Sequence, residues 1–316
     1  MTKPKVSLNG VFTPIVTSFD EHGQVAHDKM AFNLERWNQT DLKGYIVLGS
    51  NGEWVFLNEA ERMEVLRTAR QAIPSDNLMI AGTAAESTRH TINMTEQAAT
   101  IGADVAIIVN PNYYKSQMTK DVLVNHYCNV ADRSPIPIVI YNMPLATGMD
   151  LSADLLVELS QHPNIIGVKD TGGNIAKMGE TVRRADPSFQ VLSGSVNFFY
   201  PSMAIGVTGG ILALANIAPE ASVSLFELFH QRRIDEGREL HLRMLPVNLA
   251  VTSRWGVSGL KAAMDMLGYY GGPPRLPLLP LDEERRSQLR DVLRQAHLLP
   301  SDSAAETELY FVVSPV

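Results

Sequence analysis

The chain has 316 residues, of which 45% are hydrophobic and 19% are charged, a composition typical of a soluble globular protein. Its formal net charge of −7, with the lysines and arginines scattered, argues against a nucleic-acid partner or an anionic membrane surface. A single cysteine, Cys128, excludes an intrachain disulfide framework and a multi-cysteine metal site.

No targeting or membrane segment is evident in the sequence. Residues 1–10 lack the apolar core of a signal peptide, and no run of about 18 apolar residues occurs. The sequence therefore predicts a cytoplasmic protein, and a mitochondrial location stays open if a transit peptide has been removed.

Eight short apolar segments follow one another along the chain, each ending in small or polar residues. Their continuous apolar character is typical of parallel strands that are covered on both faces. The segments cover residues 10–17, 44–50, 77–83, 104–110, 137–143, 165–171, 189–195 and 209–214.

Amphipathic stretches separate these segments and carry helix start signals. Asn58, Ser87 and Ser152 each precede such a stretch and are predicted N-caps. The repeated strand–helix alternation predicts an α/β protein with a (β/α)8 TIM barrel. A doubly wound open sheet is disfavoured, because no G-x-G-x-x-G follows the first segment.

The barrel is predicted to occupy residues 1–220, followed by a C-terminal helical extension over 221–300 and a tail over 301–316. Additional C-terminal helices are expected in the extension and just before it. Their predicted spans are residues 217–245, 248–268 and 282–298.

In a barrel of this kind the active site lies at the carboxyl ends of the strands. Lys169 is the exceptional residue there, because it follows the apolar residues 165–168. Desolvation favours an uncharged amine, and a free amine is a nucleophile toward ketones. The alternative is a structural ion pair with Asp170, although adjacent strand residues point to opposite faces. Asp170 itself is assigned no catalytic role; it is expected either to support the site from behind or to be merely a turn residue.

Tyr141 ends the fifth segment, next to the sixth in a sequentially ordered barrel. Schiff-base chemistry needs a proton shuttle, and a phenol near Lys169 could act as one. The alternative is a tyrosine whose ring is simply packed at the barrel rim. In residues 49–53 (GSNGE), glycines that permit positive φ would present backbone N–H groups and the Ser50 hydroxyl to a carboxylate.

Six motifs at the strand ends resemble those of the dihydrodipicolinate synthase and N-acetylneuraminate lyase family of class I pyruvate aldolases. The resemblance covers about residues 8–297 in unbroken order. The motifs are GSNGE from Gly49, NPNYY from Asn110, YNMP from Tyr141, GVKDTGG from Gly167, LSGS from Leu192 and GGILALANIAPE from Gly209.

The resemblance implies a role for each matching residue. Lys169 would form the imine with a 2-oxo acid, Tyr141 would shuttle protons, and Ser50 would complete a hydroxyl relay. Tyr113 would join that relay from a neighbouring subunit, which implies a homo-oligomer, a dimer or tetramer. The substrate-binding residues would be Ser50, Asn51, Thr171, Gly194 and Ile211, with the Ile211 carbonyl orienting Tyr141.

Two departures from the family pattern narrow the expected reaction. Ala146 stands where dihydrodipicolinate synthases have the arginine that binds the carboxylate of aspartate semialdehyde, and Asn51 replaces the second threonine of the loop. The likeness to 4-hydroxy-2-oxoglutarate aldolases is closer and includes residues 246–261. These observations predict a carbon–carbon lyase that cleaves 4-hydroxy-2-oxoglutarate or a 2-keto-3-deoxy sugar acid to pyruvate and an aldehyde. The alternative is condensation of pyruvate with aspartate semialdehyde.

No metal or organic cofactor is expected, because the iminium would polarise the substrate and the eight histidines show no metal-ligand spacing near a strand end. Two further hypotheses remain. Gly209 and Gly210 lie where barrels often bind phosphate. A non-catalytic barrel is disfavoured by the presence of both Lys169 and Tyr141.

Overall fold

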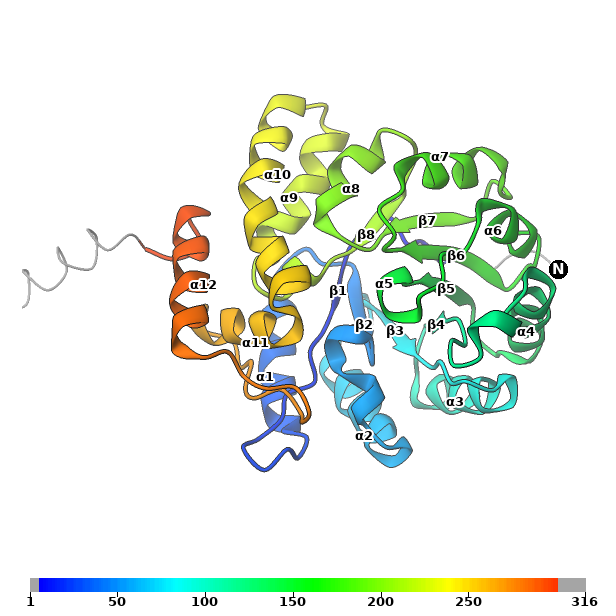
Figure 1. The fold of residues 1–316 in the computed structure, drawn as a ribbon, viewed down its shortest axis with the longest axis horizontal. Coiled ribbons are helices and arrows are strands. Elements are labelled where there is room, and N and C mark those ends of the chain that lie inside the picture. Colours follow the sequence, from blue (N-terminus) through cyan, green and yellow to red (C-terminus); the bar gives the residue numbers. More distant parts are fainter. Residues whose placement is uncertain (1–5, 301–316) are drawn as a thin grey trace, which may run out of the picture.

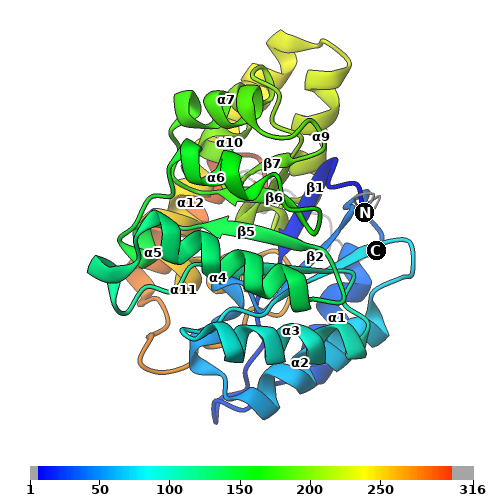
Figure 2. The same cartoon turned by 90° about the vertical axis from the view of Figure 1, so that its right-hand side faces the viewer.

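The computed structural model describes residues 6–300 and shows a closed barrel of eight parallel strands in sequential order. The predicted (β/α)8 barrel with additional C-terminal helices is confirmed. Figure 1 shows the strands enclosed by helices, and Figure 2 shows α3, α4, α6 and α7 following one another along the outside. The predicted tail over 301–316 lies outside the described residues.

All eight apolar segments form strands, each shorter than the segment that predicted it. The strands are β1 (Gly10–Pro14), β2 (Gly44–Val47), β3 (Leu78–Gly82), β4 (Val105–Val109), β5 (Ile138–Asn142), β6 (Ile165–Asp170), β7 (Gln190–Ser193) and β8 (Gly209–Ile211). Nearly every strand residue is buried, as expected for a sheet covered on both faces. The polar residues that close the predicted segments therefore lie in the loops at the carboxyl rim.

The helices of the barrel are α1 (His27–Trp37), α2 (Glu59–Ala72), α3 (Thr88–Ile101), α4 (Lys120–Arg133), α5 (Pro144–Thr147), α6 (Ala153–Leu159), α7 (Ile175–Arg184) and α8 (Val196–Met203). Short 3₁₀ helices are η1 (Ser50–Gly52), η2 (Trp54–Phe56), η3 (Lys115–Gln117) and η4 (Ala213–Asn216). The predicted caps are confirmed, since the Asn58, Ser87 and Ser152 side chains accept hydrogen bonds from backbone N–H groups of α2, α3 and α6.

The core has two layers. Inside the barrel, one buried cluster includes Phe12, Ile46, Val139, Tyr141 and Ile211, so the barrel is a packed interior and not a pore. Outside it, two larger clusters fill the space between the strands and the helices. Because Tyr141 belongs to the inner cluster, its ring is fixed by packing at the rim of the barrel.

After the barrel come α9 (Pro219–His230), α10 (Ile234–Leu249), the π-helix η5 (Ala250–Arg254), α11 (Gly256–Met266) and α12 (Glu283–Gln295). They gather on the β8–β1 side of the molecule, where α9 contacts β1 (Figure 1). The predicted break near residue 246 is wrong, because Pro246 lies inside α10 and the irregularity comes later, as a π-helix. None of the helices in residues 6–300 is long and apolar enough to span a bilayer.

Candidate active site

Lys169 and Tyr141 lie side by side at the carboxyl rim of the barrel. Their Cα atoms are register partners on β6 and β5, and the Lys169 Nζ lies 4.1 Å from the centroid of the Tyr141 ring. Both residues are buried, with 4% and 7% of their surfaces exposed. The alternative ion pair with Asp170 is not formed, because Asp170 pairs with Lys177 on the outside of the barrel.

A β-bulge determines the direction of the Lys169 side chain. Ile138 pairs with Ile165 but Val139 pairs with Gly167, so β6 contains one extra residue, Ile166. Ile166 packs in the inner cluster and Val168 in an outer one, which leaves Lys169 facing inward. A Cβ atom on Gly167 would lie 2.3 Å from the Gln190 carbonyl oxygen, so only glycine fits there.

The Tyr141 hydroxyl contacts two polarisable partners. It lies within hydrogen-bond distance of the Ser50 Oγ, at 3.4 Å, and it donates to the Met143 Sδ at 2.8 Å. Within the described residues the Ile211 carbonyl receives no hydrogen bond from Tyr141, although Ile211 lines the same cavity. The sequence reasoning missed Met143, which lies two residues after Tyr141 and so faces the same side.

The loop 49–53 is built differently from the expectation that its glycines adopt positive φ. Gly49 has φ −78°, whereas Leu48 (φ 64°) and Glu53 (φ 52°) adopt the left-handed conformation. A Cβ on Gly52 would lie 3.2 Å from the Ile15 carbonyl oxygen, closer than an ordinary contact, so a side chain there would require a small shift of its neighbours. A non-glycine residue in the left-handed backbone region costs about 1–3 kcal/mol, so the residues around it must hold it in that conformation.

Glu53 is held by a buried ion pair with the C-terminal extension. Its Oε1 lies 2.7 Å from the Lys261 Nζ, with both side chains 1% exposed, and its Oε2 accepts a hydrogen bond from the Arg275 backbone N–H at 2.8 Å. Burial lowers the pKa of Lys261, and the Glu53 carboxylate opposes that shift. The ion pair therefore joins α11 to the end of the loop that carries Ser50 and Asn51.

Replacing Lys261 by methionine should destabilise the fold by about 3–5 kcal/mol, because it leaves the Glu53 carboxylate buried without its counter-ion. Urea denaturation measures the change in the free energy of unfolding. The double variant Lys261→Met/Glu53→Gln should recover part of the loss. The matched control is Arg238→Met, which removes an exposed ion pair with Asp235 and should cause no measurable change. A Lys261→Met protein of native stability would contradict this account.

A cavity of about 310 Å³ opens above Lys169 and Tyr141. It contains all the predicted site residues except Tyr113. Among the described residues that line it, Lys169 is the only one with a charged side chain. The predicted residues along the cavity are Ser50, Asn51, Tyr141, Lys169, Thr171, Gly194 and Ile211.

Apart from Lys169, this cavity is lined by uncharged residues, both apolar and polar. Ser195 and Asn197 come from the β7–α8 junction, and Thr252 and Ser253 come from the π-helix η5. Arg254, the residue after Ser253, does not line the cavity; it donates to the Gln288 Oε1 at 2.8 Å and lies 4.3 Å over the Trp255 ring. Ser195 closes the predicted segment 189–195, and Thr252 and Ser253 belong to the stretch 246–261 that resembles the aldolases. The sequence did not assign these residues or Asn197 to the site, because their placement depends on how the extension packs on the barrel.

Tyr113, the remaining predicted site residue, does not line the cavity. Tyr113 is 77% exposed on the β4–α4 loop and forms an edge-to-face pair with Tyr114.

A Cβ on Gly209 would lie 2.4 Å from the Gly10 carbonyl oxygen, so the close approach of β8 to β1 explains this glycine without a phosphate. No group of three or more His, Cys, Asp or Glu side chains suited to a metal ion occurs in residues 6–300.

Known proteins are similar to this chain in sequence and in fold over nearly its whole length. The family model of the dihydrodipicolinate synthetase family matches residues 7–296. The chain is 35% identical over 296 residues to the 4-hydroxy-tetrahydrodipicolinate synthase of Methanothrix thermoacetophila, covering 93% of this chain and 99% of the relative. It is 36% identical over 293 residues to a probable mitochondrial 4-hydroxy-2-oxoglutarate aldolase of Emericella nidulans, covering 91% and 94% of the two chains.

Among solved structures, a prophage protein of the dihydrodipicolinic acid synthase family from E. coli K12, in complex with pyruvate, superposes with a TM-score of 0.88 at 28% identity. The match covers 93% of this chain and 100% of that one. Sequence, fold and the placement of the motif residues at one rim of the barrel agree. The chain belongs to the dihydrodipicolinate synthetase family and is a lyase of that family.

Proposed function

We propose that the protein is a class I aldolase that cleaves a 4-hydroxy-2-oxo acid to pyruvate and an aldehyde through an imine on Lys169. The observation that supports this most is the Lys169 amine on the face of the Tyr141 ring, without a carboxylate partner in residues 6–300. An amine in this position is available to a ketone entering the cavity, and the phenol beside it is available for proton transfer.

The reaction proceeds in four steps. The Lys169 Nζ attacks the C2 carbonyl, and loss of water gives the iminium. Tyr141 gives its phenol proton to the departing water, and the phenolate then takes the proton of the C4 hydroxyl. The C3–C4 bond breaks, the aldehyde leaves, and the electron pair enters an enamine. Protonation of the enamine at C3 regenerates the iminium. Water then releases pyruvate and the free amine. The iminium is the electron sink, so this chemistry needs neither a metal nor an organic cofactor.

The loop 49–53 would bind the carboxylate of the 2-oxo acid. Ser50 and Asn51 begin the 3₁₀ helix η1, and the first N–H groups of a helix have no acceptor inside it. Both residues line the cavity beside Lys169, and Thr171 and Gly194 line its opposite wall. A Cβ on Gly194 would lie 2.2 Å from the Thr171 Cγ2, so this wall keeps its shape only with glycine.

The exposed pair of Tyr113 and Tyr114 supports the proposal that a second copy of the chain supplies Tyr113 to the relay. A large aromatic side chain exposed to this degree favours burial in an interface. The active form would then be a homo-oligomer.

The uncharged lining of the cavity favours cleavage of a 2-keto-3-deoxy sugar acid, whose aldehyde half has no charge, over condensation with aspartate semialdehyde. It gives no such advantage to 4-hydroxy-2-oxoglutarate, whose aldehyde half carries a carboxylate. Aspartate semialdehyde carries its own carboxylate, and the lining residues described here offer no cation except Lys169, which the imine uses. A charge-assisted hydrogen bond contributes about 1.5–3 kcal/mol, so its absence lowers kcat/KM roughly 10- to 100-fold.

A substrate panel tests the proposed reaction. We expect pyruvate release from 2-keto-3-deoxy sugar acids with kcat/KM roughly 10- to 100-fold above that for condensation of pyruvate with aspartate semialdehyde, and no such advantage for 4-hydroxy-2-oxoglutarate. Pyruvate is measured with a coupled dehydrogenase, and the acid cleaved fastest identifies the aldehyde half. Faster condensation than cleavage of every acid tested would overturn the proposal in favour of the synthase.

A further inference from the structure

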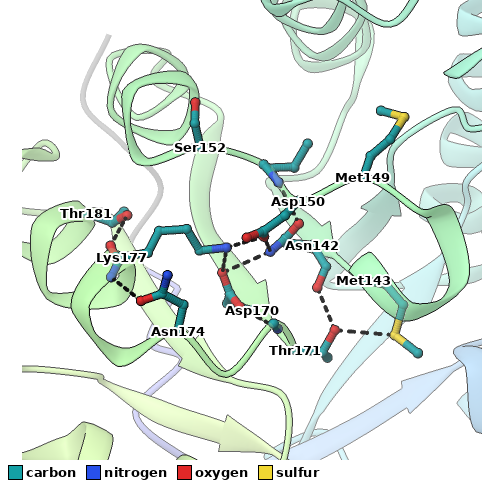
Figure 3. Close-up of polar contacts among 12 residues, drawn as sticks. Asn142, Met143, Met149, Asp150, Ser152, Asp170, Thr171, Asn174, Lys177 and Thr181 are labelled. Atoms are coloured by element: carbon teal, nitrogen blue, oxygen red, sulfur yellow. Dashed lines mark hydrogen bonds and ion pairs between the residues drawn. The ribbon is translucent and has the colours of Figure 1, made fainter. Parts of the chain in front are cut away.

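A buried polar cluster lies on the outer face of β5 and β6, directly behind Tyr141 and Lys169. We call Asn142, Asp150, Asp170 and Lys177 the outer cluster; Figure 3 shows the Lys177 ammonium reaching between the two carboxylates. Asn142 and Asp170 are 0% and 1% exposed. Successive strand residues point to opposite faces, so these two point outward because Tyr141 and Lys169 point inward.

Each member of the outer cluster has at least two partners. The Lys177 Nζ lies 2.8 Å from the Asp170 Oδ2 and also pairs with the Asp150 Oδ1. The Asn142 Nδ2 donates to the Asp150 Oδ1 at 2.8 Å and to the Asp170 Oδ2 at 3.0 Å. The other oxygen of Asp170 accepts a hydrogen bond from the Gly172 N–H at 2.7 Å. The buried charges are thus paired and hydrogen-bonded, as a buried ion pair requires.

These contacts join the ends of two strands to a helix and a loop. Asn142 and Asp170 are register partners, one position beyond the pair formed by Tyr141 and Lys169. Lys177 belongs to the first turn of α7, and Asp150 lies between α5 and α6. The Asn142 carbonyl accepts from the Thr171 N–H at 3.0 Å and from its Oγ1 at 2.8 Å. The same few contacts therefore position β5, β6 and the wall of the cavity.

We propose that Asp170, paired with the Lys177 that it shares with Asp150, is a positioning residue that holds the Lys169 amine against Tyr141 in the geometry needed for imine formation. This inference rests on the proposed function of Lys169. The main-chain pairing of β5 with β6 ends one residue past β6, at the hydrogen bond from the Thr171 N–H to the Asn142 carbonyl. The outer cluster extends that pairing through side chains. A shift of about 1 Å in a reacting group can slow a reaction about 100-fold.

The test compares variants by the rate of imine formation with pyruvate, followed by borohydride reduction and mass spectrometry, and by thermal unfolding. Asp170→Asn should form the imine roughly 10- to 100-fold more slowly at saturating pyruvate, with little change in the concentration for half-maximal rate. Asp170→Glu, which keeps the carboxylate, should recover part of the rate. The matched control is Asp154→Asn, which removes an exposed ion pair between α6 and α7 and should stay within about twofold of the wild type.

A folded Asp170→Asn protein that forms the imine at the wild-type rate would overturn the positioning role. If that variant does not fold, Asp150→Asn is tested in its place. The Asp150 side chain is 47% exposed, and this substitution removes only one of the two carboxylate partners of Lys177. Slower imine formation than in Asp154→Asn then supports the proposal, and an equal rate overturns it. Failure of the proposed function gives a different result, since the wild type itself would trap no pyruvate.

Discussion

Replacing Tyr141 by phenylalanine should lower kcat for cleavage by about 10²–10⁴-fold, the usual contribution of a general acid–base group. The variant keeps the ring, which is packed in the inner cluster and lies under the Lys169 amine. It removes only the hydroxyl that contacts Ser50 and Met143. We therefore expect a folded protein that still binds pyruvate but moves protons slowly at each step of imine chemistry.

The matched control for this experiment is Tyr45→Phe. Tyr45 also lies on a barrel strand, is 0% exposed, and donates its hydroxyl to the Asn38 Oδ1 at 2.7 Å, away from the cavity. Its loss should weaken the fold by about 1 kcal/mol and leave kcat unchanged. If Tyr141→Phe instead keeps more than about a tenth of the wild-type kcat, another group moves the protons and the proposed shuttle is wrong.

The sequence predicted the architecture and most of the residues at the cavity. Parallel strands buried on both faces appear as continuous apolar runs, so all eight were found, and the polar residue closing each run marks the carboxyl rim. Lys169 and Tyr141 stood out because each follows such a run. Their contact then followed from the sequential order of β5 and β6.

Backbone irregularities could not be predicted in the same way. The bulge at Ile166 turns Lys169 inward, yet strict alternation from Ile166 would have turned it outward. The left-handed residues of the loop were assigned to glycines, whereas Leu48 and Glu53 adopt that conformation. Glu53 is held there by Lys261, which is remote in the sequence, so local propensity contains no trace of the arrangement.

For a related reason, the sequence could not predict which residues line the rest of the cavity. Thr252 and Ser253 belong to a π-helix in a stretch that was predicted as ordinary helix, and a π-helix changes which side chains face the barrel mouth. Asn248 positions two further lining residues: it donates to the Ser195 Oγ at 3.1 Å and to the Asn197 Oδ1 at 2.9 Å. In the proposed reaction, the residues that would contact the aldehyde half are therefore brought to the cavity by tertiary packing.

The second large effect concerns Lys169, whose replacement by alanine removes the nucleophile. Turnover should fall by about 10³-fold or more, since no other group can supply the electron sink. Stability should change little, because the amine is not part of a buried ion pair within residues 6–300. Among the described residues, no lysine besides Lys169 lines the cavity. The control is therefore Lys29→Ala, which replaces an exposed residue of α1 that pairs with Asp28.

The most direct measurement is borohydride reduction in the presence of pyruvate, followed by mass spectrometry of the intact chain and of its peptides. The proposed mechanism predicts a pyruvate-dependent adduct on Lys169 in the wild type and in Lys29→Ala, and none in Lys169→Ala. An unmodified wild-type chain, or an adduct on any other lysine, would contradict it.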